Sequence, residues 1–187
     1  MRKVIFGINV TLDGCCDHTK ANPYEEVHRY FAELLRDTDT LVYGRKTYQL
    51  MVPFWPDMAK SNSEQPSSMS DFAEAFDSVP EIVVFSRTLD SASEPDKTTI
   101  VRDDPQGELL RLKQIPGKNI LLGGVDLPSQ LIEHDLIDEY HFVVQPIIAG
   151  EGRRLFDDIS LPEKLQLKLA ESKTFDSGCV ALRFVKQ

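Results

Sequence analysis

The sequence is poor in the residues that stabilise small secreted domains or bind polyanions. Its 187 residues include three cysteines, Cys15, Cys16 and Cys179, whose odd number and spacing match neither a disulfide framework nor a zinc site. We therefore expect reduced thiols and no bound metal. Only 21 basic residues stand against 30 acidic ones, a net charge of −9, which excludes binding of nucleic acid or anionic membranes through a broad basic surface.

Long apolar runs are also missing. No stretch approaches the roughly 20 apolar residues that cross a membrane, and the run after Lys3 is too short for a signal peptide. We expect a soluble protein of the cytoplasm. With 41% hydrophobic residues, the chain is long enough to build a core without disulfides or metals, which predicts one domain over residues 1–187.

Hydrophobic periodicity predicts strands that alternate with helices. Apolar runs indicate strands at residues 3–10, 40–43, 82–85, 119–122 and 140–148, with a weaker one near 99–101. Two further strands, 165–174 and 180–185, are joined by a predicted hairpin turn. This order predicts an α/β fold with a mostly parallel central sheet, helices on both faces and an antiparallel C-terminal hairpin. Residues 52–70, rich in proline and serine, are expected to form a long surface loop.

Three turns that follow predicted strands carry donors suited to phosphate: Gly44, Arg45, Lys46 and Thr47; Ser86, Arg87 and Thr88; Gly123 and Gly124. Because ligands of open α/β sheets bind at the carboxyl ends of the strands, we expect these turns to meet there. Adjacent glycines let the backbone approach a pyrophosphate, whose charge a helix N-terminus attracts. Each turn alone is a weak signal and more often ordinary structure, but together the three favour a dinucleotide with an additional phosphate. The G-x-G-x-x-G pattern of Rossmann dehydrogenases is absent.

The order of these motifs resembles the dihydrofolate reductase superfamily. The resemblance covers nearly the whole chain and includes Thr11-Leu12-Asp13-Gly14, Gly44-Arg45-Lys46-Thr47-Tyr48, Phe85-Ser86-Arg87-Thr88-Leu89 and Leu122-Gly123-Gly124. The sequence is most similar to the bacterial branch that includes the C-terminal reductase domain of bifunctional riboflavin-biosynthesis deaminase/reductases. That resemblance implies a three-layer α/β/α fold, NADPH as the hydride donor and a homodimer. The zinc-binding deaminase half of the bifunctional proteins has no counterpart here.

The resemblance also implies a role for each turn. The turn of Gly44, Arg45, Lys46 and Thr47 would bind the pyrophosphate and the adenosine phosphate end of NADPH. Ser86, Arg87 and Thr88 would approach the 2′-phosphate, and Gly123 and Gly124 would cradle the pyrophosphate. Arginine suits this task because its planar guanidinium holds a phosphate through paired donors.

The substrate side departs from the family pattern. Dihydrofolate reductases place a carboxylate on the first long helix, whereas the matching position here falls near His28, with Glu26 close by. This departure argues against folate reduction. Asp13 is the best remaining acid, although its carboxylate equally suits a turn cap. His28 is alternatively a partly buried structural histidine, and Glu26 an ordinary first-turn acid.

Three more residues are candidates for the substrate site. Tyr48 and Trp55 follow the first cofactor turn and are suited to wall an aromatic pocket, while core packing explains Tyr48 equally well. Trp55 lies among prolines, in a segment typical of a lid or a subunit contact. Gln145, at the end of a central strand, offers an amide to a substrate edge, or to solvent.

The sequence therefore leads to an enzyme hypothesis and two alternatives. The first is an NADPH-dependent reductase of a small heteroaromatic substrate of the pterin, folate or ribitylamino-pyrimidine type. The second is a nucleotide- or pterin-binding module of the same fold without turnover, suggested by the missing helix carboxylate. The third is a structural or interaction protein.

Overall fold

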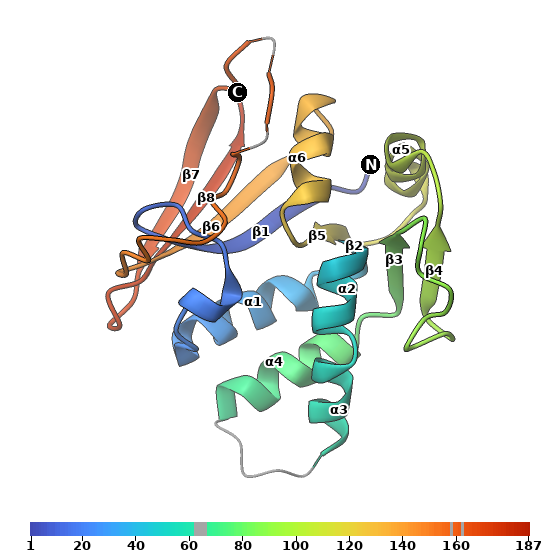
Figure 1. Cartoon of the computed structure of the whole chain (residues 1–187), viewed down its shortest axis with the longest axis horizontal. Helices are drawn as coiled ribbons and strands as arrows, with labels where there is room; N and C mark the ends of the chain where they lie inside the picture. The colour runs from blue at the N-terminus through green and yellow to red at the C-terminus, as the bar shows by residue number, and fades with distance from the viewer. Residues whose placement is uncertain (62–66, 158, 162) are drawn as a thin grey trace.

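The computed structural model describes residues 1–61, 67–157, 159–161 and 163–187, and an eight-stranded sheet forms its centre. The strands lie in the order β4-β3-β2-β5-β1-β6-β8-β7 (Figure 1). Their bounds are β1 (Val4–Thr11), β2 (Thr38–Gly44), β3 (Glu81–Phe85), β4 (Thr98–Val101), β5 (Asn119–Leu122), β6 (Glu139–Gln145), β7 (Leu167–Thr174) and β8 (Val180–Lys186).

The pairing of the strands confirms the predicted sheet. The pairs among β1 to β6 are all parallel, whereas β8 is antiparallel to both β6 and β7. The turn between β7 and β8 closes where the Phe175 amide donates to the Cys179 carbonyl at 2.9 Å, with Gly178 at a φ of +84°. A positive φ is accessible to glycine without steric cost, which explains the Gly in this hairpin.

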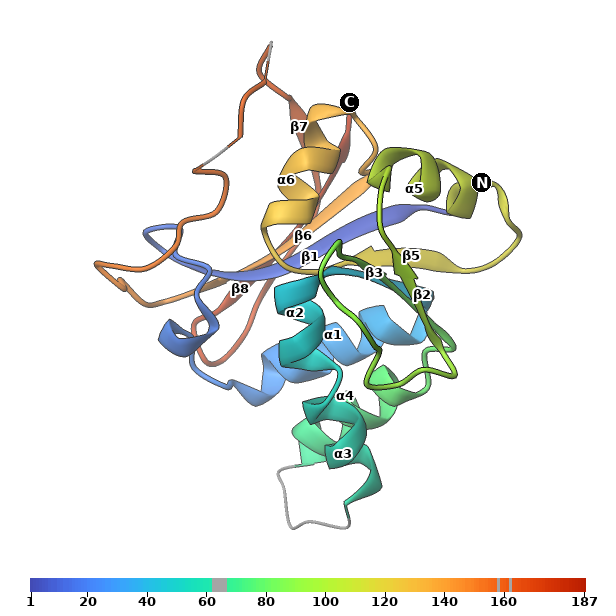
Figure 2. The same cartoon turned by 45° about the vertical axis from the view of Figure 1, so that its right-hand side comes forward.

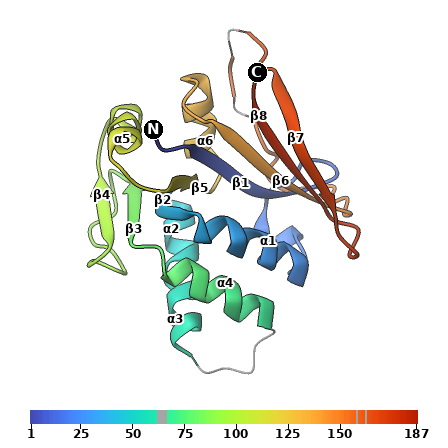
Figure 3. The same ribbon diagram turned by 180° about the vertical axis from the view of Figure 1, so that it is seen from behind.

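Helices cover both faces of the sheet, as Figures 2 and 3 show from two further sides. One face carries α1 (Glu25–Arg36), α2 (Arg45–Met51), α3 (Phe54–Lys60) and α4 (Ser67–Asp77), and the other carries α5 (Pro105–Gln114) and α6 (Asp126–Glu133). A single turn of 3-10 helix, η1 (His18–Lys20), lies between β1 and α1. The three-layer α/β/α fold is therefore confirmed.

Side chains alternate between the two faces of the central strands, so each helical layer packs on its own hydrophobic core. Ile5 and Leu41 belong to the core beneath α1 and α4, while their neighbours Phe6 and Val42 belong to the core beneath α5 and α6. All four side chains are buried. Successive residues of a strand point to opposite faces, so a strand buried on both faces has the continuous apolar run seen in this sequence.

The prediction of a long surface loop over residues 52–70 is wrong in part. Helix α3 forms within it, α4 begins at Ser67, and residues 62–66 lie outside the described residues. Pro53 is the N-cap of α3 and Pro56 lies in its first turn, where the backbone nitrogens need no partner within the helix. Trp55 is buried against Phe72 of α4, with ring centroids 4.4 Å apart. The prolines start a helix here instead of preventing one.

No helix in the described part of the chain has the length and apolar character to cross a membrane.

Candidate functional site

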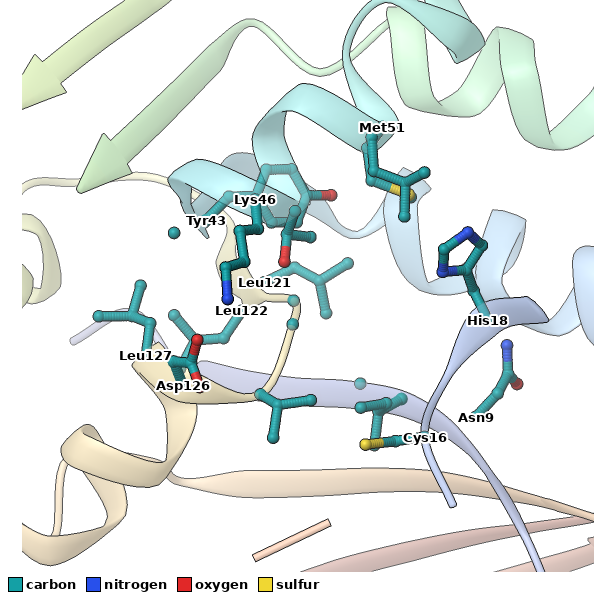
Figure 4. A pocket seen from close by; sticks show the side chains of 18 of the residues that line it. Asn9, Cys16, His18, Tyr43, Lys46, Met51, Leu121, Leu122, Asp126 and Leu127 are labelled. Atoms are coloured by element: carbon teal, nitrogen blue, oxygen red, sulfur yellow. The ribbon is translucent and has the colours of Figure 1, made fainter. Parts of the chain in front are cut away.

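A cavity of about 1380 Å³ opens at the carboxyl edge of the parallel strands. The register of the sheet brings the three predicted turns to this edge, because Gly44 of β2 pairs with Phe85 of β3 and Val42 with Leu122 of β5. Residues from β1, from α1 to α4 and from the start of α6 complete its walls. Figure 4 shows part of this lining. The fold therefore brings the three turns together at one edge of the sheet, as predicted.

The turn between β5 and α6 is built so closely that only glycine fits. A Cβ at Gly123 would lie 2.5 Å from Cε1 of Tyr43, and one at Gly124 would lie 2.3 Å from Oγ1 of Thr47. Gly124 also has a φ of +88°, which L side chains rarely adopt. The turn therefore presents bare backbone to the cavity, directly before the N-terminus of α6.

Basic side chains surround the same end of the cavity. Arg45 and Lys46 begin α2 and are exposed, and Figure 4 shows Lys46 extending toward Asp126. Arg87 is exposed and lies 3.4 Å from the Asp103 carboxylate. These three predicted residues all line the cavity. Because exposed ion pairs are weak, an anionic ligand can compete with Asp103 for Arg87.

The turn that follows β3 is shaped by Ser86. Its side chain is buried, and its Oγ accepts hydrogen bonds from the backbone amides of Thr88 and Leu89 at 3.2 and 2.9 Å. Ser86 lines the cavity, whereas Thr88 is exposed and does not belong to the described lining. The sequence reasoning missed Arg102, which lines the cavity and donates to the Ser86 carbonyl at 3.1 Å.

His28 and Trp55 lie together at the other end of the cavity. The ring centroids are 6.1 Å apart, and His28 lies at 6.0 Å from the ring of Phe72. Nδ1 of His28 is buried without a hydrogen-bond partner among the described residues. Burial lowers the pKa of His28 below its ordinary value, which keeps the imidazole neutral at pH 7.

Gln145 lines the cavity, but its amide is engaged. Oε1 accepts from the Asn22 backbone amide at 2.9 Å, and Nε2 donates to the Asn22 carbonyl at 3.3 Å. The side chain is 1% exposed. Gln145 therefore fixes the segment before α1 to the end of β6, and a substrate amide would have to displace this pair.

Tyr48 and Glu26, both predicted to bind substrate, do not belong to the described lining of the cavity. Tyr48 is fully buried, and its hydroxyl accepts from the Ser93 amide at 2.9 Å. Glu26 accepts from the amides of Asp176 and Ser177 at 3.0 and 3.1 Å, contacts that lower its carboxyl pKa. Tyr48 anchors the loop before β4, and Glu26 anchors the β7–β8 turn.

Asp13, predicted as the proton donor, is likewise absent from the described lining, and its contacts favour the alternative of a turn cap. Its carboxylate accepts from the Thr11 hydroxyl at 2.6 Å and from the amides of Ala149 and Gly150 at 3.0 and 2.9 Å. These hydrogen bonds, that of Thr11 above all, hold the pKa of the Asp13 carboxyl far below its usual range. Asp13 is the turn cap that the sequence left as its alternative.

Asn9 is a cavity residue that the sequence reasoning missed. It lies on β1 on the same face as Ile5 and Gly7, the face toward α1, and its Oδ1 is buried without a hydrogen-bond partner in the described residues. The signal was an amide side chain inside an otherwise apolar central strand, where an unpaired polar group is costly. Among the residues that the structure describes, no group of three or more His, Cys, Asp or Glu side chains is placed to hold a metal ion.

Comparison of the sequence with known protein families identifies the family of this chain. Residues 2–181 match the model of the RibD C-terminal domain family. The chain belongs to the RibD C-terminal domain family. Another relative is the uncharacterized protein YyaP of Bacillus subtilis, 30% identical over 97% of this chain and 93% of its own length.

Solved structures similar to this RibD C-terminal domain share its fold. A protein of Shewanella sp. PV-4, provisionally named a riboflavin biosynthesis protein, has a TM-score of 0.74 at 22% identity, with 100% of this chain and 99% of that chain covered. RibD of Acinetobacter baumannii has a TM-score of 0.69 at 17% identity. This domain covers 58% of that longer chain.

Proposed function

We propose that the protein is an NADPH-dependent reductase of a small heteroaromatic substrate, similar to the reductase domain of the riboflavin pathway. The observation that carries the proposal is the cradle of Gly123 and Gly124. A Cβ at either position would lie within 2.5 Å of a neighbouring side chain, so only glycine fits this turn, and the two glycines line the cavity with backbone alone. Family membership supports the reductase class.

The residues of the basic end fit a dinucleotide with an additional phosphate. The Gly123-Gly124 backbone and the first turn of α6 would hold the pyrophosphate, since amides at a helix N-terminus are free to bind an anion. Arg45 and Arg87 would bind the 2′-phosphate, with Arg102 as a third guanidinium at the same edge. When bound, NADPH supplies a hydride.

The chain itself would orient the two reacting rings and exclude water from them. The cavity continues from the basic end to the aromatic end without leaving the sheet edge, so a nicotinamide and an acceptor ring can lie against one another. Trp55 and Phe72 exclude water from the aromatic end, and His28 is held against both rings.

Titration calorimetry with NADPH and NADH tests the cofactor assignment. We expect NADPH to bind more tightly, and Arg87→Ala to reduce that preference by roughly tenfold, the cost of about one charged hydrogen bond. Arg29→Ala is the matched control, because Arg29 is exposed and paired with Glu25 at 2.7 Å outside the cavity. Absence of binding, or tighter binding of NADH, would contradict the assignment.

One observation favours the second candidate, a binding module without turnover. None of the α1 acids lines the described cavity, and the three acids that do are engaged elsewhere. Asp126 pairs with Arg153, Asp103 lies beside Arg87, and Asp17 caps η1. Spectrophotometric assay of NADPH oxidation with pterins, dihydrofolate and ribitylamino-pyrimidines separates the two candidates, since the module predicts binding without oxidation.

A homodimer remains part of the proposal. Strand β7 lies at one end of the sheet, and within the described residues its outer edge has no paired strand. Such an edge offers backbone donors and acceptors to another chain. Sedimentation velocity of the purified protein tests this assignment.

A further inference from the structure

The aromatic end of the cavity has no lysine or arginine in its described lining, although the opposite end has several. Residues of β1, α1, α3 and α4 form this end, and no lysine or arginine from these elements lines the described cavity. The basic residues that line it are Arg45, Lys46, Arg87, Arg102 and Arg153.

The basic residues of the surrounding helices are directed elsewhere. Arg29 pairs with Glu25 at 2.7 Å, Arg36 with Asp71, and Lys60 with Glu94 at 3.1 Å. All three are exposed on the outer surface of the helices. Residues 61–86 contain no lysine or arginine at all, so no basic side chain of that segment is available to the aromatic end.

Arg153 is held at the basic end. It pairs with Asp126, the first residue of α6, directly after the Gly123-Gly124 turn. Figure 4 shows Lys46 and Asp126 together on one side of the view and Asn9 with His18 on the other. The cations of this cavity therefore gather where the cofactor is proposed to bind.

Two polar side chains that line the cavity, Asn9 and His28, each have one buried polar atom without a described partner. These atoms are Oδ1 of Asn9 and Nδ1 of His28. Asn9 comes from the face of β1 that packs on α1, where a Cβ at Gly7 would lie 3.2 Å from Cε1 of Phe31. His28 lies on α1 itself, beside Trp55. Burying unpaired polar atoms costs free energy, and small rotations of these two side chains would let a ligand in the cavity pair with them.

We infer that the substrate is an uncharged, planar heteroaromatic compound without a phosphate group, bound by Asn9 and His28 at its polar edge and by Trp55 at its ring. This inference rests on the proposed function and narrows its substrate class. An edge with neighbouring N–H and C=O groups complements a side-chain amide and a neutral imidazole. A phosphate at this end would lose its hydration without meeting a lysine or an arginine.

The chain contains a natural probe for this site. Trp55 is the only tryptophan in the sequence, and it lines the aromatic end of the cavity. Its fluorescence therefore reports binding there without a label and without turnover.

Two compounds that differ only in the phosphate test the inference: 5-amino-6-ribitylaminouracil and its 5′-phosphate. They are titrated against the full chain at pH 8, where an ordinary imidazole is neutral, by Trp55 fluorescence and by calorimetry. We expect the phosphate-free compound to bind at least as tightly as its ester. Tighter binding of the ester, or binding of neither compound, overturns the inference.

Variants test the assigned contacts. Asn9→Ala and His28→Phe should each weaken binding of the phosphate-free compound by roughly tenfold, because each removes one hydrogen-bonding group. Gln114→Ala, at an exposed residue of α5 outside the described lining, is the matched control and should leave binding unchanged. If neither Asn9→Ala nor His28→Phe weakens binding, the contacts are wrong. Calorimetry with NADPH is run in parallel, so that failure of the cofactor assignment is seen separately from the Trp55 titration.

Discussion

Thr47 and Gly124 lie so close together at the cavity edge that the threonine hydroxyl occupies the space where a side chain on Gly124 would lie. A Cβ on Gly124 would lie 2.3 Å from Oγ1 of Thr47 and 3.3 Å from its Cβ. Thr47 lies on α2 and Gly124 precedes α6, so this contact joins the two faces of the sheet at its carboxyl edge. The relationship makes Gly124 the most sensitive position of the proposed cofactor site.

Gly124→Ala is expected to weaken NADPH binding by at least roughly tenfold, equivalent to about 1.4 kcal/mol. The added methyl group displaces Thr47 and opposes the φ of +88°. Gly150→Ala is the control for backbone strain, because Gly150 has a φ of +75° with no atom within 4 Å of an added Cβ. Calorimetric titration of both variants measures the difference. Equal affinities for NADPH would mean that the cradle does not hold the cofactor.

Asp13→Asn is expected to lower the melting temperature at pH 7 while leaving turnover unchanged. An amide oxygen cannot replace the carboxylate that serves Thr11, Ala149 and Gly150 together. Because the folded pKa of Asp13 is lowered, its ionised form stabilises the protein above the unfolded pKa of about 3.9, and this stabilisation disappears as the pH falls below it.

Thermal unfolding of wild type and Asp13→Asn from pH 7 to pH 3 checks this expectation, and the two melting temperatures should converge toward the acidic end. Asp90→Asn, at an exposed aspartate, controls for the loss of one charge. A loss of turnover without a loss of stability would restore Asp13 as the acid of the reaction.

Tyr48→Phe is expected to destabilise the fold by about 1 kcal/mol, because it removes the hydroxyl that accepts from the amide of the exposed Ser93. For a chain of this length, this corresponds to a drop of roughly 2–4 °C in melting temperature for each kcal/mol. The Kd of the phosphate-free heteroaromatic probe should not change, since Tyr48 lies outside the described lining of the cavity. Differential scanning calorimetry and the Trp55 titration measure the two effects, and an altered Kd at unchanged stability would return Tyr48 to the substrate site.

The free energy of unfolding is expected to decrease as the pH falls below about 6.5, partly because of His28. Burial lowers its pKa in the folded protein, so the unfolded chain binds a proton over the interval between that value and its own pKa of about 6.5. Above pH 6.5 the contribution is constant. Urea unfolding at pH 8, 6.5 and 5.5 measures the slope, which His28→Gln should reduce. An unchanged slope in His28→Gln would show that other groups cause the loss.

Local pattern was sufficient to predict the fold and the basic end of the site. Strands buried on both faces appear as continuous apolar runs, and the alternation of strands with helices favours a parallel sheet. The carboxyl ends of parallel strands must share one edge, so the turns at Gly44, Ser86 and Gly123 could be brought together before any contact was known. The prolines of α3 were misread because Pro53 and Pro56 are compatible with the first turn of a helix as well as with a loop.

The sequence by itself determined the order of layers, the sheet edge that holds the cavity and the residue types that line its basic end. Only the tertiary structure decided what each polar side chain does, because the partners are far away along the chain. Asp13 meets Ala149, Glu26 meets Ser177, and Gln145 meets Asn22. The unpaired buried atoms of Asn9 and His28 could not be predicted for the same reason, because a polar group is known to be unpaired only when everything packed around it is in place.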